Sequence, residues 1–279
     1  MHFSIVIAVI FVATLLGSLC GIGGGVIIKP VLDAIDSFSK FQIALISLSC
    51  VLTTSLTSVI KHLFYKTKIS FKESFVLSIG GILGGIAGNF FFNFIRDIVN
   101  DAYPETGKEI ITLIQNAGIG SLIFLVLLYM LTLKKKGVSY HLNSLLVTGI
   151  IGVFLGMISV FLDIGGGAIN VCIFILLFSM DVKLAAVNSL LVIVFSQTTK
   201  LIQYVIMGNF RDNVTFDDTL TWWLFVILIA VSVLTGIIGS HYNKKIDSKY
   251  IDFAYEGSLV AIILISGYNV INISIKLSN

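Results

Sequence analysis

The feature that most constrains the fold is a series of long apolar segments with almost no charge. The runs at 110–133 and 221–241 are each about 20 residues long, enough for a helix to cross a ~30 Å hydrocarbon core. Charged residues make up only 12% of the 279 residues, whereas a soluble domain carries about 25%. The sequence therefore predicts an all-α integral membrane protein, multi-pass and located in the plasma or inner membrane.

The apolar segments fall into two sets of five. They lie near 3–20, 26–36, 41–60, 74–95 and 110–133, and then near 142–162, 168–180, 184–207, 221–242 and 253–275. We interpret the first segment as a retained membrane helix, because no Lys or Arg precedes it as in a signal peptide. The predicted organisation is a first membrane repeat at 1–133, a basic cytoplasmic linker at 134–141 (KKKGVSYH) and a second membrane repeat at 142–279.

A glycine-rich stretch occurs at the same place in both sets. CGIGGGVIIKP at 20–30 is followed 142 residues later by LDIGGGAINVC at 162–172. Aligning Gly21 with Asp163 gives nine identities over 28 positions, including all three following glycines and the pair Ser47 and Ser189. The order of segments and glycine clusters also recurs, which indicates two homologous repeats.

The charges of the loops indicate that the two repeats are inverted. If each glycine-rich unit turns back within the membrane, loops 61–73, 134–136, 181–183 and 243–252 share one side and hold 11 of the 16 Lys and Arg outside apolar segments. If each unit crosses once, the split is 9 to 7. Because Lys and Arg concentrate on the cytoplasmic side, we favour the first arrangement, with both termini on the opposite side. The arms at 26–36 and 168–180 would then be re-entrant half-helices of roughly 17–20 Å.

The duplicated glycines are candidates for a ligand site. Non-helical backbone is tolerated at membrane depth only inside the protein or along a wet cavity, and a helix that begins there presents unpaired N–H groups to an anion. The substrate-binding candidates are Gly23, Gly24, Gly25, Gly165, Gly166 and Gly167. Tight helix packing is the alternative, and we favour it for Gly80, Gly81, Gly84, Gly85 and Gly88.

Polar residues within apolar segments are the other candidates. Charged side chains at a helix centre cost at least ~2.5–3.5 kcal/mol, so Asp163 is expected either to couple transport to another ion or to pair with Lys200 or Lys29. Lys29 could instead snorkel to an interface. The remaining substrate-binding candidates are Ser55, Asn170, Gln197 and Lys200.

The stretch GIGGGVIIKPVL at 21–32 resembles the glycine-rich signature of the TauE/SafE family of sulfite exporters and sulfonate permeases. Gly21, Gly23, Gly24, Gly25, Pro30 and Leu32 match the signature in the first repeat. In the second repeat, Asp163 replaces a glycine and Cys172 replaces the proline. The resemblance implies secondary transport of small anions, often sulfur oxyanions or organic sulfonates. A carboxylate at the site would repel such an anion unless it is protonated or paired.

We therefore expect a secondary transporter for a small anion such as sulfite or a sulfonate, with a proton or sodium as coupling ion. An anion-conducting or other ion channel with a glycine-lined pore is the alternative. No nucleophile or acid–base constellation within the apolar segments indicates an enzyme, and no residue pattern indicates a cofactor, a metal site or a nucleic acid partner. The sequence leaves the oligomeric state open, a homodimer included.

Overall fold

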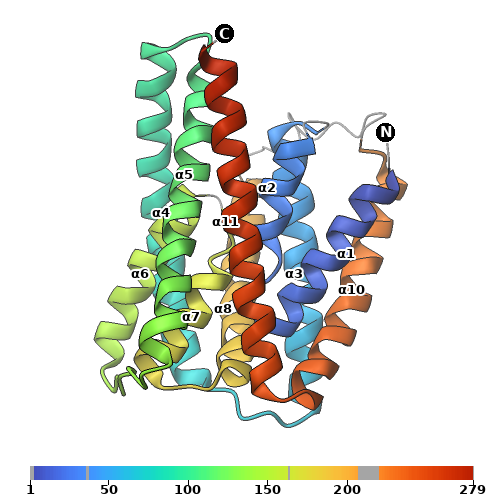
Figure 1. The fold of residues 1–279 in the computed structure, drawn as a ribbon, viewed down its shortest axis with the longest axis vertical. Helices are drawn as coiled ribbons and strands as arrows, with labels where there is room; N and C mark the ends of the chain where they lie inside the picture. Colours follow the sequence, from blue (N-terminus) through green and yellow to red (C-terminus); the bar gives the residue numbers. More distant parts are fainter. Residues whose placement is uncertain (1–2, 36–37, 163, 207–219, 279) are drawn as a thin grey trace.

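The computed structural model describes residues 3–35, 38–162, 164–206 and 220–278, and within these ranges the chain forms helices and no strand. The first half contains α1 (Phe3–Cys20), α2 (Gly25–Ile35), α3 (Lys40–Phe64), α4 (Phe71–Ala102) and α5 (Gly107–Leu128), which continues as the π-helical turn η1 (Tyr129–Lys134). The second half contains α6 (Leu145–Phe161), α7 (Gly167–Phe178), α8 (Val182–Ile206), α10 (Trp222–Lys245) and α11 (Ser248–Ser278). All ten apolar segments are thus helical, which confirms the all-α membrane fold (Figure 1).

Helix length separates spanning from non-spanning segments. Within the described ranges, seven helices are long and apolar enough to cross a membrane: α1, α3, α4, α5 with η1, α8, α10 and α11. α6 has 17 residues, and α2 and α7 have 11 and 12, only ~17–18 Å as helix. The long helices extend beyond their apolar segments. α4 has 32 residues, and its polar last turns extend into the stretch between the apolar segments 74–95 and 110–133.

The glycine-rich units turn back on themselves. Figure 1 shows α1 running downward and α2 returning upward, whereas α6 runs upward and α7 returns downward. The two hairpins therefore run in opposite directions in this view, and the inverted arrangement of the repeats stays a prediction. That the halves are homologous repeats divided at 134–141 stays a prediction.

One end of the molecule gathers the lysine-rich loops. Lys134 forms an ion pair with Asp252, Nζ of Lys244 donates to the Tyr65 carbonyl at 3.2 Å, and Nζ of Lys183 donates to the Lys244 carbonyl at 3.1 Å. These contacts join the ends of α3, η1, α8, α10 and α11. We call this the lysine-rich end, and the opposite end, which holds both chain ends in Figure 1, the terminal end.

Local signals explain where helices begin. Ser39 and Gln42 form a capping box before α3, in which the Ser39 hydroxyl accepts from the Gln42 amide and Gln42 Oε1 accepts from the Ser39 amide. The Ser144 hydroxyl caps α6 in a similar way. Such caps satisfy first-turn N–H groups that would otherwise lack acceptors.

Small residues allow α4 to pack closely against α6. A side chain at Gly84 would collide with the Val153 carbonyl, and one at Gly88 would come within 2.8 Å of the Met157 backbone. The packing interpretation is therefore right for this face of α4. On its neighbouring face, Gly81 and Gly85 leave room for a cavity instead.

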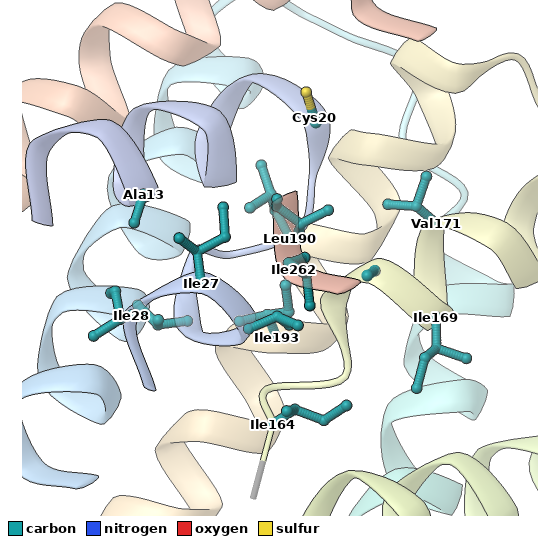
Figure 2. Close-up of a cluster of buried hydrophobic side chains, with 14 of the residues drawn as sticks. Ala13, Cys20, Ile27, Ile28, Ile164, Ile169, Val171, Leu190, Ile193 and Ile262 are labelled. Carbon is teal, nitrogen blue, oxygen red and sulfur yellow. The ribbon is translucent and has the colours of Figure 1, made fainter. Parts of the chain in front are cut away.

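The hydrophobic core lies around the two glycine-rich turns. Ile28 of α2 and Leu190 and Ile193 of α8 are completely buried there. Figure 2 shows them close to Ile27 from the first unit and Ile164 from the second. The turns are thus held between apolar side chains from both halves.

Candidate functional site

The two glycine-rich turns meet in the middle of the protein. A side chain at Gly167 would collide with the Ile22 carbonyl, and a Cβ at Gly25 would lie 3.9 Å from the Gly165 amide nitrogen. The buried Ser189 hydroxyl lies 2.7 Å from the Gly21 carbonyl and 3.1 Å from the Gly167 carbonyl and donates toward both. One hydroxyl of α8 therefore ties the first turn to the second.

A cavity of about 820 Å³ begins at the second turn and lies between α4, α6 and α8. Ile164, Gly165 and Gly166 line one part of it, and Arg96 of α4 and Lys108 of α5 line the part near the terminal end. The polar side chains that line it are Asn89, Asn93, Ser159, Asn170, Ser196, Gln197, Thr199 and Gln203. These polar groups lie among apolar and glycine residues and mark a partly polar route from the terminal end to the turn.

The charged groups that line the cavity are positive. They are Arg96, Lys108 and Lys200, and within the described part of the chain no carboxylate lines it. Asp97 pairs with Arg96 at 3.3 Å, but both side chains are largely exposed to solvent, where such a pair is screened. Cations in a cleft with low-dielectric walls raise the local concentration of anions.

Two buried amides on this cavity lack hydrogen-bond partners among the described residues. Gln197 of α8 is 7% exposed and Asn170 of α7 is 4% exposed, and both line the cavity. Their polar atoms face the cavity, where water or a ligand can bind them. A ligand or water that accepts from both amides would satisfy them.

The start of α7 lies beside these amides. Gly166 is the N-cap residue of α7 and has a φ of 70°, and no side chain caps the start of the helix. The side-chain nitrogen Nδ2 of Asn170 would be only 3.6 Å from a Cβ at Gly166. First-turn N–H groups and the positive end of the helix dipole therefore lie next to the Asn170 amide, an arrangement that favours an anion.

A small recess adjoins the floor of the cavity. It has a volume of about 10 Å³ and shares Ala44, Gly165, Gln197 and Lys200 with the cavity. Lys29, Ile43, Ser47 and Leu48 complete its walls. Lys29 is 7% exposed and donates to Gln115 Oε1 at 3.2 Å, so the expectation that it snorkels to an interface is wrong.

The cavity is lined by half of the ten substrate-binding candidates that the sequence predicted. Gly165, Gly166, Asn170, Gln197 and Lys200 line the cavity. Gly23, Gly24, Gly25, Gly167 and Ser55 are buried and are not among its lining residues. Asp163, the expected coupling residue, lies outside the described residues.

The first turn has a structural reason for its glycines. Gly24 has a φ of 84°, and a Cβ there would be 2.8 Å from the Ala13 carbonyl of α1. Both its conformation and its close approach to α1 favour glycine. In this state of the protein, the first turn supports the site and the second turn lines it.

The sequence reasoning missed the part of the cavity that α4 contributes. Gly81, Gly85, Asn89 and Asn93 recur every four residues and share one helix face, with Arg96 three residues further on. This spacing was visible in the sequence. The small and polar residues on one side of an apolar helix were the signal for a wet surface.

Comparison with known proteins agrees with a membrane transporter. The family model described as Sulfite exporter TauE/SafE matches residues 6–266. The chain is similar to the probable membrane transporter protein YunE of Bacillus subtilis (strain 168), with 24% identity over 283 residues that cover 90% of this chain and 92% of that protein. No solved structure matches the chain significantly.

Proposed function

The chain belongs to the sulfite exporter TauE/SafE family of membrane transporters, and on this premise we propose that it is a secondary transporter for a small sulfur-containing anion such as sulfite or a sulfonate. The observation that carries the proposal is the pair of amides, Gln197 and Asn170, that line a cavity together with Lys200, Arg96 and Lys108. We place the protein in the plasma or inner membrane.

The bound anion would be held at the second turn. Its oxygens would accept from the side-chain N–H groups of Gln197 and Asn170 and from the first-turn amides of α7, while Lys200 supplies charge. Hydrogen bonds to a charged partner contribute about 1.5–3 kcal/mol each, more than neutral ones. Three or four such bonds would offset the loss of hydration that the anion suffers inside the membrane.

The lining of the cavity differs toward its two ends, which favours a transporter over an open channel. Toward the terminal end it continues to Arg96 and Lys108. Toward the lysine-rich end it stops near Leu77, where Asn188 of α8 accepts hydrogen bonds from the Ser74 hydroxyl and the Ser70 amide of α4. By the positive-inside rule the lysine-rich end is cytoplasmic, so this state would accept anions from outside the cytoplasm.

The opposite state would open the interface between α3 and α10. With the 142-residue offset, α3 and α10 correspond to α8 and α4, yet they are closed by bonds from Thr54 to the Ser232 carbonyl at 3.2 Å and from Ser58 to the Gly236 carbonyl at 3.1 Å. Ser55, the counterpart of Gln197, is completely buried and its hydroxyl has no partner. Opening this interface would expose Ser55 to the anion and let the anion leave toward the lysine-rich end, as in transporters with inverted repeats.

Flux into proteoliposomes tests this function. We expect saturable uptake of labelled sulfite, thiosulfate or a sulfonate that depends on a proton or sodium gradient and is strongly reduced in Lys200→Gln. Lys72→Gln, which changes an exposed lysine of α4, is the control. Single-channel currents in planar bilayers, or uptake that does not saturate, would support the channel instead.

A further inference from the structure

Ser159 of α6 brings a hydroxyl to the second glycine-rich turn, next to the amides of Asn170 and Gln197. We propose that this hydroxyl is a third side-chain donor to the anion and makes the site selective for head groups with three oxygens, such as a sulfonate, over carboxylates. The inference rests on the proposed anion transport and concerns which head group that same site accepts.

Two consecutive glycines bring the three side chains together. A Cβ at Gly166 would lie 2.6 Å from Ser159 Oγ and 3.6 Å from Asn170 Nδ2, so both groups lie against the same side of this glycine. A Cβ at Gly165 would lie 2.7 Å from Gln197 Nε2. The three side chains belong to α6, α7 and α8, and all of them line the cavity. An anion at the turn therefore meets one donor from each of three helices.

The Ser159 hydroxyl is available to a ligand. In membrane helices, a serine or threonine hydroxyl often donates to a carbonyl of its own helix. Two other hydroxyls that line the cavity do so. Ser196 donates to the Ile193 carbonyl at 3.1 Å, and the Thr199 hydroxyl donates to a carbonyl of α8 at 2.9 Å. Within the part of the chain that the structure describes, Ser159 Oγ makes no hydrogen bond, so its hydrogen can turn toward the cavity.

Three side-chain donors match a head group with three oxygens. The oxygens of a sulfonate point in three directions, one for each donor, whereas the two oxygens of a carboxylate lie in one plane. A carboxylate that accepts from Asn170 and Gln197 leaves Ser159 without a well-placed acceptor. A site built to hydrogen-bond one group of its substrate discriminates against analogues that lack this group, because its own polar group then stays unpaired. Ser159 is therefore the residue that separates the two classes of anion.

Binding of matched anions to the purified full-length protein in detergent tests the inference. The pairs are methanesulfonate with acetate and ethanesulfonate with propionate, which share charge and alkyl group, measured by isothermal titration calorimetry at neutral pH and constant ionic strength. We expect the wild-type protein to bind each sulfonate about tenfold more tightly than its carboxylate, the size of one hydrogen bond to a charged group. Equal binding, tighter binding of the carboxylates or binding of none of the four anions would overturn the inference. Only the absence of flux of any anion would overturn the proposed function itself.

Ser159→Ala then assigns the preference to the hydroxyl. Because this hydroxyl bonds to no other described residue, the variant should fold normally, lose about tenfold in affinity for the sulfonates and keep its affinity for the carboxylates. Sulfonates are also less strongly hydrated than carboxylates, but a preference of that origin would persist in Ser159→Ala. A Ser159→Ala protein with the wild-type ratio of affinities would therefore contradict the proposal.

Two further variants complete the test. Thr148→Val on the same helix is the matched control, because the Thr148 hydroxyl donates to the Ser144 carbonyl at 3.0 Å and does not line the cavity. It should keep the wild-type ratio. Ser159→Cys should lose the preference as the alanine variant does, since a thiol of similar size is only a weak donor. It decides the question where Ser159→Ala fails to fold.

Discussion

The hydroxyl of Ser74 on α4 donates a hydrogen bond of 2.8 Å to Oδ1 of Asn188 on α8, and both residues are completely buried. The same oxygen accepts from the Ser70 amide at 2.9 Å, and Asn188 Nδ2 donates to the Leu184 carbonyl. Leu77 and Val192, one turn further along each helix, already line the cavity. The contact therefore closes the cavity on the side of the lysine-rich end.

Ser74→Ala is expected to favour the state that opens toward the lysine-rich end. A buried hydrogen bond contributes about 1 kcal/mol, so its loss should shift the ratio of the two states about fivefold. A cysteine at Leu77, in a background without the native cysteines, should react faster with a maleimide added from that side. Ser78→Ala is the matched control, because the Ser78 hydroxyl donates to the Ser74 carbonyl within its own helix. Equal rates in both variants would mean that Ser74 is no part of a gate.

The two ends of the molecule are expected to lie on opposite sides of the membrane. Lys135 and Lys245 belong to the lysine-rich end, and Lys276 lies near the end of α11. Single cysteines at 135 and 245 should be protected from an impermeant maleimide in intact cells, whereas a cysteine at 276 should react. Opposite reactivity of 135 and 245 would contradict the arrangement in which the glycine-rich units turn back.

Much of this fold could be predicted because the bilayer imposes it. Residues 3–20 form a helix with those same bounds, and the other nine apolar segments coincide with helices whose ends differ by up to seven residues. Apolar length and glycine placement are local properties that a sequence displays directly. The distribution of lysines likewise identified which loops share an end, since it reflects how the chain is inserted.

The site was harder to predict because it depends on which faces meet. The sequence analysis treated both glycine turns as equivalent, but only the second lines the cavity. The α3 and α10 helices are joined near the first turn, whereas α4 and α8 leave room for the cavity beyond their Ser74–Asn188 contact. In a single conformation the two halves differ, because one of them lines a cavity and the other is closed. No sequence pattern indicates which half is open. The burial of Lys29 was missed for a similar reason. Its partner Gln115 is 86 residues away and reaches it only through tertiary packing.

The two turns should respond differently to substitution. Gly24→Leu is expected to prevent folding, because φ is 84° and the Cβ would be 2.8 Å from the Ala13 carbonyl, which is backbone and cannot move aside. A Cβ at Gly165 would instead be 2.7 Å from Gln197 Nε2, the end of a flexible side chain. Gly165→Ala should therefore fold but lose anion binding. Monodispersity and binding measured on both variants test this, and normal transport by Gly24→Leu would contradict it.

Asp163 is expected to couple transport to protons. It directly precedes Ile164 and Gly165, which line the cavity, and a carboxylate there repels an anion unless it takes up a proton or a partner. Asp163→Asn should still bind anion but lose the pH dependence of transport. Flux into proteoliposomes between about pH 5.5 and 8 is the measurement. If this variant keeps the pH dependence of the wild type, transport is coupled through another residue or to sodium.

Gln197→Leu is expected to lower the affinity for the anion without lowering the stability of the fold. Because the Gln197 amide lines the cavity and makes no hydrogen bond to another described residue, replacing it with an apolar side chain of similar size breaks no contact within the protein and should leave the melting temperature nearly unchanged. Anion affinity should fall about tenfold or more, since a bond to a charged ligand is lost.

Asn269→Leu is the matched contrast, because the equally buried Asn269 amide already donates to the Pro30 carbonyl at 3.0 Å and to Asn116 Oδ1 at 3.1 Å. Its loss leaves two acceptors unsatisfied, so the melting temperature should fall while the anion site stays intact. Thermal unfolding with and without a bound anion distinguishes the two. A Gln197→Leu protein that is less stable than wild type and binds anions normally would show that Gln197 holds the fold rather than the substrate.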